Sequence, residues 1–389
     1  MAQYNPRTVF RQTSNPLLRE FFQSKGHRID VDWDEIGNTQ IQGIYEAFLD
    51  LDDVARRDLE IELHDIHTVA QSDDGIRILV ENAVFMGHDI ADELEASDSR
   101  YDKAMTVLLR YPQVWDKAVT LVHADNLSKR CWYRRNALPK QPPDISEAAM
   151  DMLRRDVSVF YWQAQGRGQR CQIDHIQRSE NQDYFFVYLS DHANTDLTWD
   201  DAGKLQRVRR RCAFEVVFVF DSSNGTMDVF AHGGQKVIEP LQEIFAKAII
   251  GVDLDPEDPE IPYWVEGLKD RSFQFVTDPE DGITQVAVRM LRMHPLGNKN
   301  NKLTVKLPSD AKPEDIYDWL DTKLDTTELP ISVLRVERAT ISMKLDGYGR
   351  KKSLTFDIGP KSCTLKSESE QFRKLGEKYL KNWGLDRAE

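Results

Sequence analysis

Three residues near the start of the chain have the types and spacing of metal ligands. Glu60, His64 and His67 are separated by four and then three positions. Residues at these spacings share one face of an α-helix, and divalent metals accept carboxylate and imidazole ligands. His88 and Asp89 supply the same ligand types further along the chain. The pattern predicts a candidate divalent-metal site made of these five residues.

This set of residue types resembles that of the helical metal-dependent phosphohydrolases of the HD class. In that class a histidine, a His-Asp pair and a later aspartate come from separate helices, and Asp116 or Asp125 would be the last ligand here. The resemblance is limited to the residue types. It implies a metal-bound water that attacks phosphorus. A solvated, charged helix face is the alternative interpretation of the same residues.

Three basic segments carry residue types that bind nucleic acid, because cations neutralise phosphates and aromatic rings stack on bases. Each segment is also typical of a solvated face, and a joint site requires the fold to bring the segments together. The candidate contact residues are Lys129, Arg130, Trp132, Tyr133, Arg134 and Arg135 in the first segment, Arg207, Arg209, Arg210 and Arg211 in the second, and Arg350, Lys351 and Lys352 in the third.

The charge of the chain is unevenly distributed. The formal net charge of −14 divides into −12 for residues 1–128, −5 for residues 129–270 and +3 for residues 271–389. An acidic region repels polyanions, whereas local positive patches can form in the later segments. We therefore expect any nucleic-acid contact to lie after residue 128.

The N-terminal sequence and the cysteines bear on location. No apolar stretch follows a basic start, and no run of apolar residues is long enough to span a membrane. The four cysteines stand at least 40 positions apart, which is neither a disulfide-rich pattern nor a metal-binding pair. These features predict a soluble, cytoplasmic chain with reduced cysteines and no membrane partner.

The hydrophobic periodicity changes along the chain. Apolar residues recur at helical spacing over residues 15–127, which predicts a small helical bundle. Strand patterns follow, and three stretches have the order strand, strand, helix: residues 213–250, 285–324 and 332–384. The predicted class is therefore α+β, with an N-terminal helical bundle followed by a strand-rich portion with strand–strand–helix units.

Two proline-bearing polar stretches suggest domain boundaries. Residues 138–144 cannot continue a helix, and residues 253–260 form an acidic, proline-rich connection. The predicted domains are a helical acidic domain at residues 1–137, an α+β domain at 144–252, and an α+β domain with a C-terminal helix at 262–389.

These observations favour a non-enzymatic binding or adaptor component that contacts nucleic acid or a protein partner through the basic-aromatic segments. No cofactor is predicted for it. The alternative is a metal-dependent phosphohydrolase or nuclease that uses the His and Asp ligands of the helical region and a divalent metal. A third hypothesis is an obligate subunit of a multiprotein assembly, for example in bacterial defence.

Overall fold

The computed structural model describes residues 4–33, 35–37, 40–97, 99–128, 131–200, 202–254, 262–298, 300–308, 311–324, 330–348 and 351–387. The chain divides into two compact units. Unit 1 consists of Met1–Leu127, Arg178–Glu180 and His192–Cys212, and unit 2 consists of Ser128–Gln177, Asn181–Asp191 and Ala213–Glu389. Helices fill the N-terminal region and two antiparallel sheets lie in the C-terminal part, so the predicted α+β class is confirmed.

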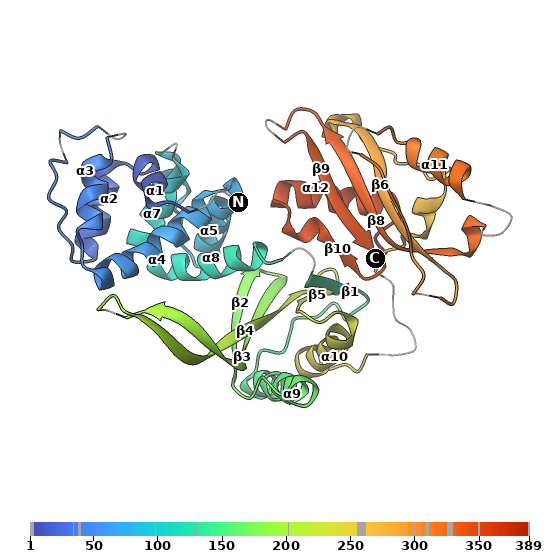
Figure 1. Cartoon of the computed structure of the whole chain (residues 1–389), viewed down its shortest axis with the longest axis horizontal. Coiled ribbons are helices and arrows are strands. Elements are labelled where there is room, and N and C mark those ends of the chain that lie inside the picture. Colours follow the sequence, from blue (N-terminus) through green and yellow to red (C-terminus); the bar gives the residue numbers. More distant parts are fainter. Residues whose placement is uncertain are drawn as a thin grey trace. The chain divides into compact units, whose positions relative to one another are not determined.

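The N-terminal part of unit 1 is a set of helices packed through apolar faces (Figure 1). Leu63, Ile66 and Leu79 are among its fully buried or nearly fully buried side chains. Ser72 and Ser99 cap two of the helices, since each hydroxyl accepts a hydrogen bond from a backbone N–H of the first turn. The helices are α1 (Pro6–Gln12), α2 (Asn15–Ser24), α3 (Gln42–Leu49), α4 (Asp53–Ala70), α5 (Asp73–Phe85), α6 (Ala91–Glu95), α7 (Arg100–Arg110) and α8 (Pro112–Asp125).

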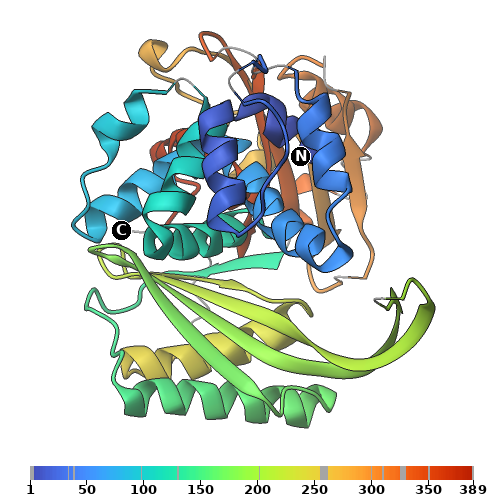
Figure 2. The ribbon, with the colours of Figure 1, turned by 90° about the vertical axis from the view of Figure 1, so that its left-hand side faces the viewer.

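The first sheet has the strand order β1-β5-β4-β3-β2, with β1 (Trp132–Arg135), β2 (Cys171–Ser179), β3 (Gln182–Trp199), β4 (Leu205–Asp221) and β5 (Thr226–Phe230). Two helices, α9 (Glu147–Gln165) and α10 (Gln235–Phe245), cover one of its faces (Figure 2). Their apolar side chains and those of the strands form one core, in which Phe218 stacks on Phe245 with ring centroids 4.8 Å apart. The near-continuous apolar run of β4 is buried there, as its sequence predicts.

The β4–β5 connection shows why one glycine is required. Gly225 has a φ of +62°, and a Cβ atom at this position would lie 2.2 Å from the carbonyl oxygen of Leu138. Asp221 accepts hydrogen bonds from the backbone N–H groups of Ser223 and Asn224 at 3.0 and 3.1 Å. Asn224-Gly225 in the sequence favours a tight hairpin, and the antiparallel pairing of β4 with β5 shows that one forms here.

Strands β3 and β4 are longer than the other strands of the first sheet. Their ends, residues 192–212, belong to unit 1 and are called the arm below. Figure 2 shows the two strands side by side, with a marked curve along their length. The sequence predicts only the inner parts of these strands.

The second sheet has the order β10-β9-β8-β6-β7 and is antiparallel throughout. Its strands are β6 (Ile283–Pro295), β7 (Leu303–Lys306), β8 (Leu334–Leu345), β9 (Ser353–Gly359) and β10 (Ser362–Cys363). Two helices, α11 (Asp315–Lys323) and α12 (Glu370–Asn382), contribute to its core. The three predicted strand–strand–helix units are therefore present, and the pairing of β6 with β8 joins the second and third units in one sheet.

The last helix packs as its sequence pattern predicts. Phe372, Leu375, Tyr379 and Trp383 recur at helical spacing, and all four belong to the core of the second sheet. Each is less than one tenth exposed. Their spacing places them on one face of the helix, which explains why α12 docks by that face.

No helix in the described part of the chain is long and apolar enough to cross a membrane. The four cysteines are free thiols. The proposed division into three domains stays a prediction. Unit 2 contains two sheets, and each sheet has a hydrophobic core of its own.

Candidate nucleic-acid interface

The last four residues of the first basic segment, Trp132–Arg135, form strand β1 of the first sheet. Lys129 and Arg130 lie outside the described residues. Trp132 is 4% exposed, whereas Tyr133 and Arg135 are half-buried. The alternation of a strand sends neighbouring side chains to opposite faces, so this short run does not present one continuous basic-aromatic surface.

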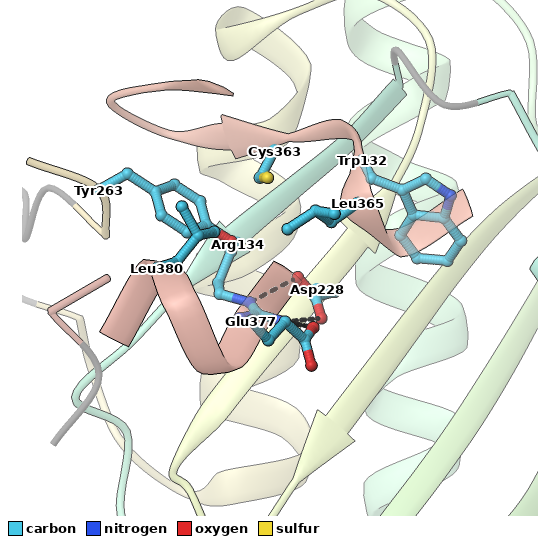
Figure 3. A pocket seen from close by; sticks show the side chains of 8 residues that line it. All are labelled: Trp132, Arg134, Asp228, Tyr263, Cys363, Leu365, Glu377 and Leu380. Carbon is cyan, nitrogen blue, oxygen red and sulfur yellow. Dashed lines mark hydrogen bonds and ion pairs between the residues drawn. The ribbon is translucent and has the colours of Figure 1, made fainter. Parts of the chain in front are cut away.

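Arg134 lies in a network of three carboxylates, two of which, Asp228 and Glu377, are drawn in Figure 3. Its Nε and Nη2 donate to the two carboxylate oxygens of Asp228 at 3.1 and 3.2 Å. Glu377, from α12, lies 3.7 Å from the same Nη2, and Asp386, near the C-terminus, lies 3.6 Å from Nη1. The network connects a strand of the first sheet to elements that follow the second sheet.

The charge of Arg134 is held by these neighbours. Burial lowers the pKa of its guanidinium, but Asp228, Tyr263 and Glu377 together raise that pKa well above its ordinary value. A buried cation with such partners is costly to separate from them. The guanidinium is therefore occupied by contacts inside unit 2.

A polar cleft beside this network contains both signs of charge. Its charged lining residues comprise three cations and four carboxylates. A mixed lining of this kind gives no positive field that would attract a polyanion. These charged residues are Arg134, Arg373, Lys381, Asp221, Asp228, Glu377 and Asp386.

The second basic segment lies on the arm, where side chains alternate between two faces. Arg210 pairs with Asp196 on the opposite strand, and Gln206 donates to Asp200. Even-numbered side chains of both strands thus share one face of the arm, called the even face. Odd-numbered side chains then share the other face, called the odd face.

The odd face combines cations with large apolar side chains. Arg207, Arg209 and Arg211 are exposed, and none of them forms an ion pair within the described residues. Trp199 is 68% exposed and Leu197 is 64% exposed on the same face. Exposed apolar side chains grouped in this way are typical of binding surfaces.

In the third basic segment, one described lysine forms an ion pair and the other is exposed. Arg350 lies outside the described residues. Lys351 pairs with Glu368, and its ammonium group lies 4.2 Å from the centroid of the Phe372 ring. Lys352 is exposed.

Three of the candidate metal ligands lie on α4. His67 is 3% exposed, and its Nδ1 is 3.0 Å from the hydroxyl oxygen of Tyr101. The side chain of His64 is 59% exposed, and Glu60 is half-buried. Burial thus separates His67 from His64, although both occupy one helix.

The other two candidate ligands follow α5. His88 and Asp89 are exposed, and the ring centroids of His88 and Tyr111 lie 5.5 Å apart. Among the described residues, no group of three or more His, Cys, Asp or Glu side chains is placed to hold a metal ion. The metal site therefore stays a prediction, and the described residues contain no cluster of ligands that supports it.

The structure thus brings together one predicted segment with residues that sequence reasoning missed. Leu197, Trp199 and Leu205 belong to the odd face, and strand alternation across residues 205–211 was the signal that would have identified it. The first and third segments belong to unit 2 and the second to unit 1. Convergence of all three segments on one surface stays a prediction.

Comparison with protein-family models gives no match, and comparison with curated proteins finds none that is similar to this chain.

Proposed function

We propose that the protein is a binding or adaptor component that contacts nucleic acid through the odd face of the arm. The observation that carries this proposal is the presence of three exposed arginines without an ion pair beside an exposed tryptophan, within the described residues. Arginine pairs with phosphate oxygens in a two-pronged geometry, and tryptophan stacks on a base of any sequence.

The shape of the arm supports the proposal. A two-stranded β-ribbon is narrow enough to enter the major groove of duplex DNA, and a row of side chains along one face can also follow a single strand. The chain as a whole is acidic, with a net charge of −14. Electrostatic repulsion elsewhere would then favour contact through a local basic face.

The two faces of the arm provide a matched pair of variants. Arg209→Gln and Arg210→Gln remove the same charge from neighbouring positions of β4, but only Arg209 lies on the odd face. The second variant also releases Asp196 from its ion pair, which makes it a stringent control. We expect Arg209→Gln to weaken nucleic-acid binding more than Arg210→Gln does.

Fluorescence anisotropy with labelled single-stranded and duplex oligonucleotides at low salt measures this difference. Trp199→Ala should weaken binding by about 1–3 kcal/mol if a base stacks on the ring. Circular dichroism and thermal unfolding confirm that each variant is folded. Absence of binding to either oligonucleotide, or equal effects of the two arginine variants, would overturn the proposal and leave a protein partner as the hypothesis to pursue.

A further inference from the structure

A groove on the second sheet is lined by side chains that point away from its core. Ile341 and Met343 on β8 belong to the core, whereas the alternate residues Thr340 and Ser342 line the groove. The described lining residues are Arg289, Met290, Arg292, Thr304, Lys306, Leu307, Arg338, Thr340, Ser342, Thr355 and Asp357.

The strand register places two of its arginines side by side. Arg292 on β6 is the direct partner of Arg338 on β8, and Thr304 on β7 is the direct partner of Arg292 on the other side. Like charges directly opposite each other destabilise a sheet. Lys306 occupies the next level of the sheet, opposite Met290. An anion between these cations would turn their repulsion into attraction.

Arg289 adds a buried cation to the groove. The register between β6 and β8 shifts between Val288 and Met290, so that Arg289 has no partner on β8. Such a bulge redirects a side chain. Arg289 is 7% exposed; its Nη1 donates to the carbonyl oxygen of Ala311, while its Nε has no acceptor within the described residues.

The groove has an excess of positive charge. Asp357 is the one carboxylate among its described lining residues, and it accepts a hydrogen bond from the Thr340 hydroxyl at 2.6 Å and lies 3.9 Å from Arg338. Four cations against one carboxylate leave a formal charge of +3. Arg292 and Lys306 form no ion pair in the described part of the chain.

We propose that this groove binds the diphosphate group of a small phosphorylated molecule. A terminal diphosphate carries about three negative charges near neutral pH, since a phosphate monoester already carries about −1.5 to −2. That charge matches the excess in the groove. Hydroxyl groups of Thr304, Ser342 and Thr355 are available for a polar ligand, and Ser342 and Thr355 lie within 2.9 Å of each other.

The lining also distinguishes this groove from the arm. No aromatic side chain is among the described residues of the groove, so it has no platform on which a base could stack. A nucleic acid would therefore gain only backbone contacts there. The proposal is independent of the arm, because the two surfaces share no residue.

Isothermal titration of the full-length protein with pyrophosphate tests the proposal. We expect saturable binding, weakened about tenfold or more in the double variant Arg292→Gln/Arg338→Gln, which removes two charge-assisted contacts. The matched control is Arg271→Gln/Lys302→Gln. It removes the same charge from two cations that pair with Asp318, Asp321 and Glu337, and it should bind like the parent protein.

Further results support or overturn the proposal. Arg209→Gln and Trp199→Ala should leave pyrophosphate binding unchanged, which separates this site from the proposed nucleic-acid interface. Absence of pyrophosphate binding at millimolar concentration, or equal loss in both double variants, would overturn the proposal. The proposal would also be overturned if Arg292→Gln/Arg338→Gln weakened oligonucleotide binding and the parent protein did not bind pyrophosphate. Thermal unfolding shows whether each double variant is folded.

Discussion

Arg292 and Arg338 lie directly opposite each other on the neighbouring antiparallel strands β6 and β8. Asp357 lies 3.9 Å from Arg338, while Arg292 forms no ion pair within the described residues. The sheet thus contains a like-charge pair of which one member is left without a counter-ion in the protein. This repulsion between the two arginines lowers the stability of the ligand-free protein. A bound anion would attract both arginines and remove that cost.

Replacing Arg292 should therefore stabilise the ligand-free protein. Threonine favours β-structure and removes the repulsion, so we expect Arg292→Thr to raise the free energy of unfolding by about 0.2–1 kcal/mol. Urea denaturation of the full-length protein, followed by tryptophan fluorescence, measures the change. Added pyrophosphate should stabilise the parent protein more than the variant, because binding to the folded state shifts the equilibrium. A variant that is less stable without ligand would contradict this account of the arginine pair.

The salt dependence of oligonucleotide binding should show whether the three arginines of the odd face contact phosphates. Each neutralised phosphate adds about 0.7–0.9 to the slope of log affinity against log salt concentration. Replacement of Arg207, Arg209 and Arg211 by glutamine should therefore reduce the slope by about 2–3. Anisotropy titrations at several salt concentrations give this value. An unchanged slope would mean that these side chains do not contact phosphates.

Arg134 should contribute to stability through its buried ion pairs. Arg134→Met leaves Asp228 without its two hydrogen bonds from the guanidinium, and we expect a loss of about 3–5 kcal/mol in the free energy of unfolding. Arg134→Met/Asp228→Leu should lose less than the sum of the two single variants, because the second change removes the uncompensated carboxylate. Additive effects in urea denaturation would argue against direct coupling.

The β4–β5 turn should make stability depend on pH in the acid range. Burial raises the pKa of Asp221, but hydrogen bonds from Ser223 and Asn224 outweigh that effect and lower the pKa below its ordinary value of 3.8. A carboxyl group whose pKa is lower in the folded state stabilises that state above the unfolded pKa, and this contribution disappears as the pH falls through the folded pKa.

Asp221→Asn should accordingly reduce stability near neutral pH, and its difference from the parent protein should narrow as the pH falls below about 4. Thermal unfolding across this range provides the measurement. Ser179→Ala, at the exposed end of β2, serves as a surface control for which no such trend is expected. A difference that is constant with pH would show that the Asp221 carboxylate is not responsible.

Local patterns predicted the elements well where each pattern was complete within one segment. The apolar stripe from Phe372 to Trp383 identified the buried face of α12, and Asn224-Gly225 identified the β4–β5 hairpin. Both depend on residues a few positions apart. Their physical causes, helix periodicity and positive φ, operate over the same short range.

The candidate sites depended on information that a single segment does not contain. Arg134 looked like a surface cation in the sequence, because its partners Asp228, Glu377 and Asp386 come from distant parts of the chain. The groove was not predicted because only the register between β6 and β8 brings Arg292 to Arg338. The odd face could have been predicted from the sequence, because the alternate arginines of β4 indicate one strand face. That prediction would have required the strand to begin at Leu205.

The division of the arm into two unlike faces restricts how its length can vary. Inserting one residue into β4 between Leu205 and Arg207 would shift Arg207 and the later arginines by one position relative to β3. Arginines of the odd face would then lie on the even face, and Arg210 would lie on the odd face. Inserting two residues would keep every arginine on its own face. Relatives of this chain that retain the same interface should therefore differ in arm length by even numbers of residues per strand, or compensate an odd change with a bulge.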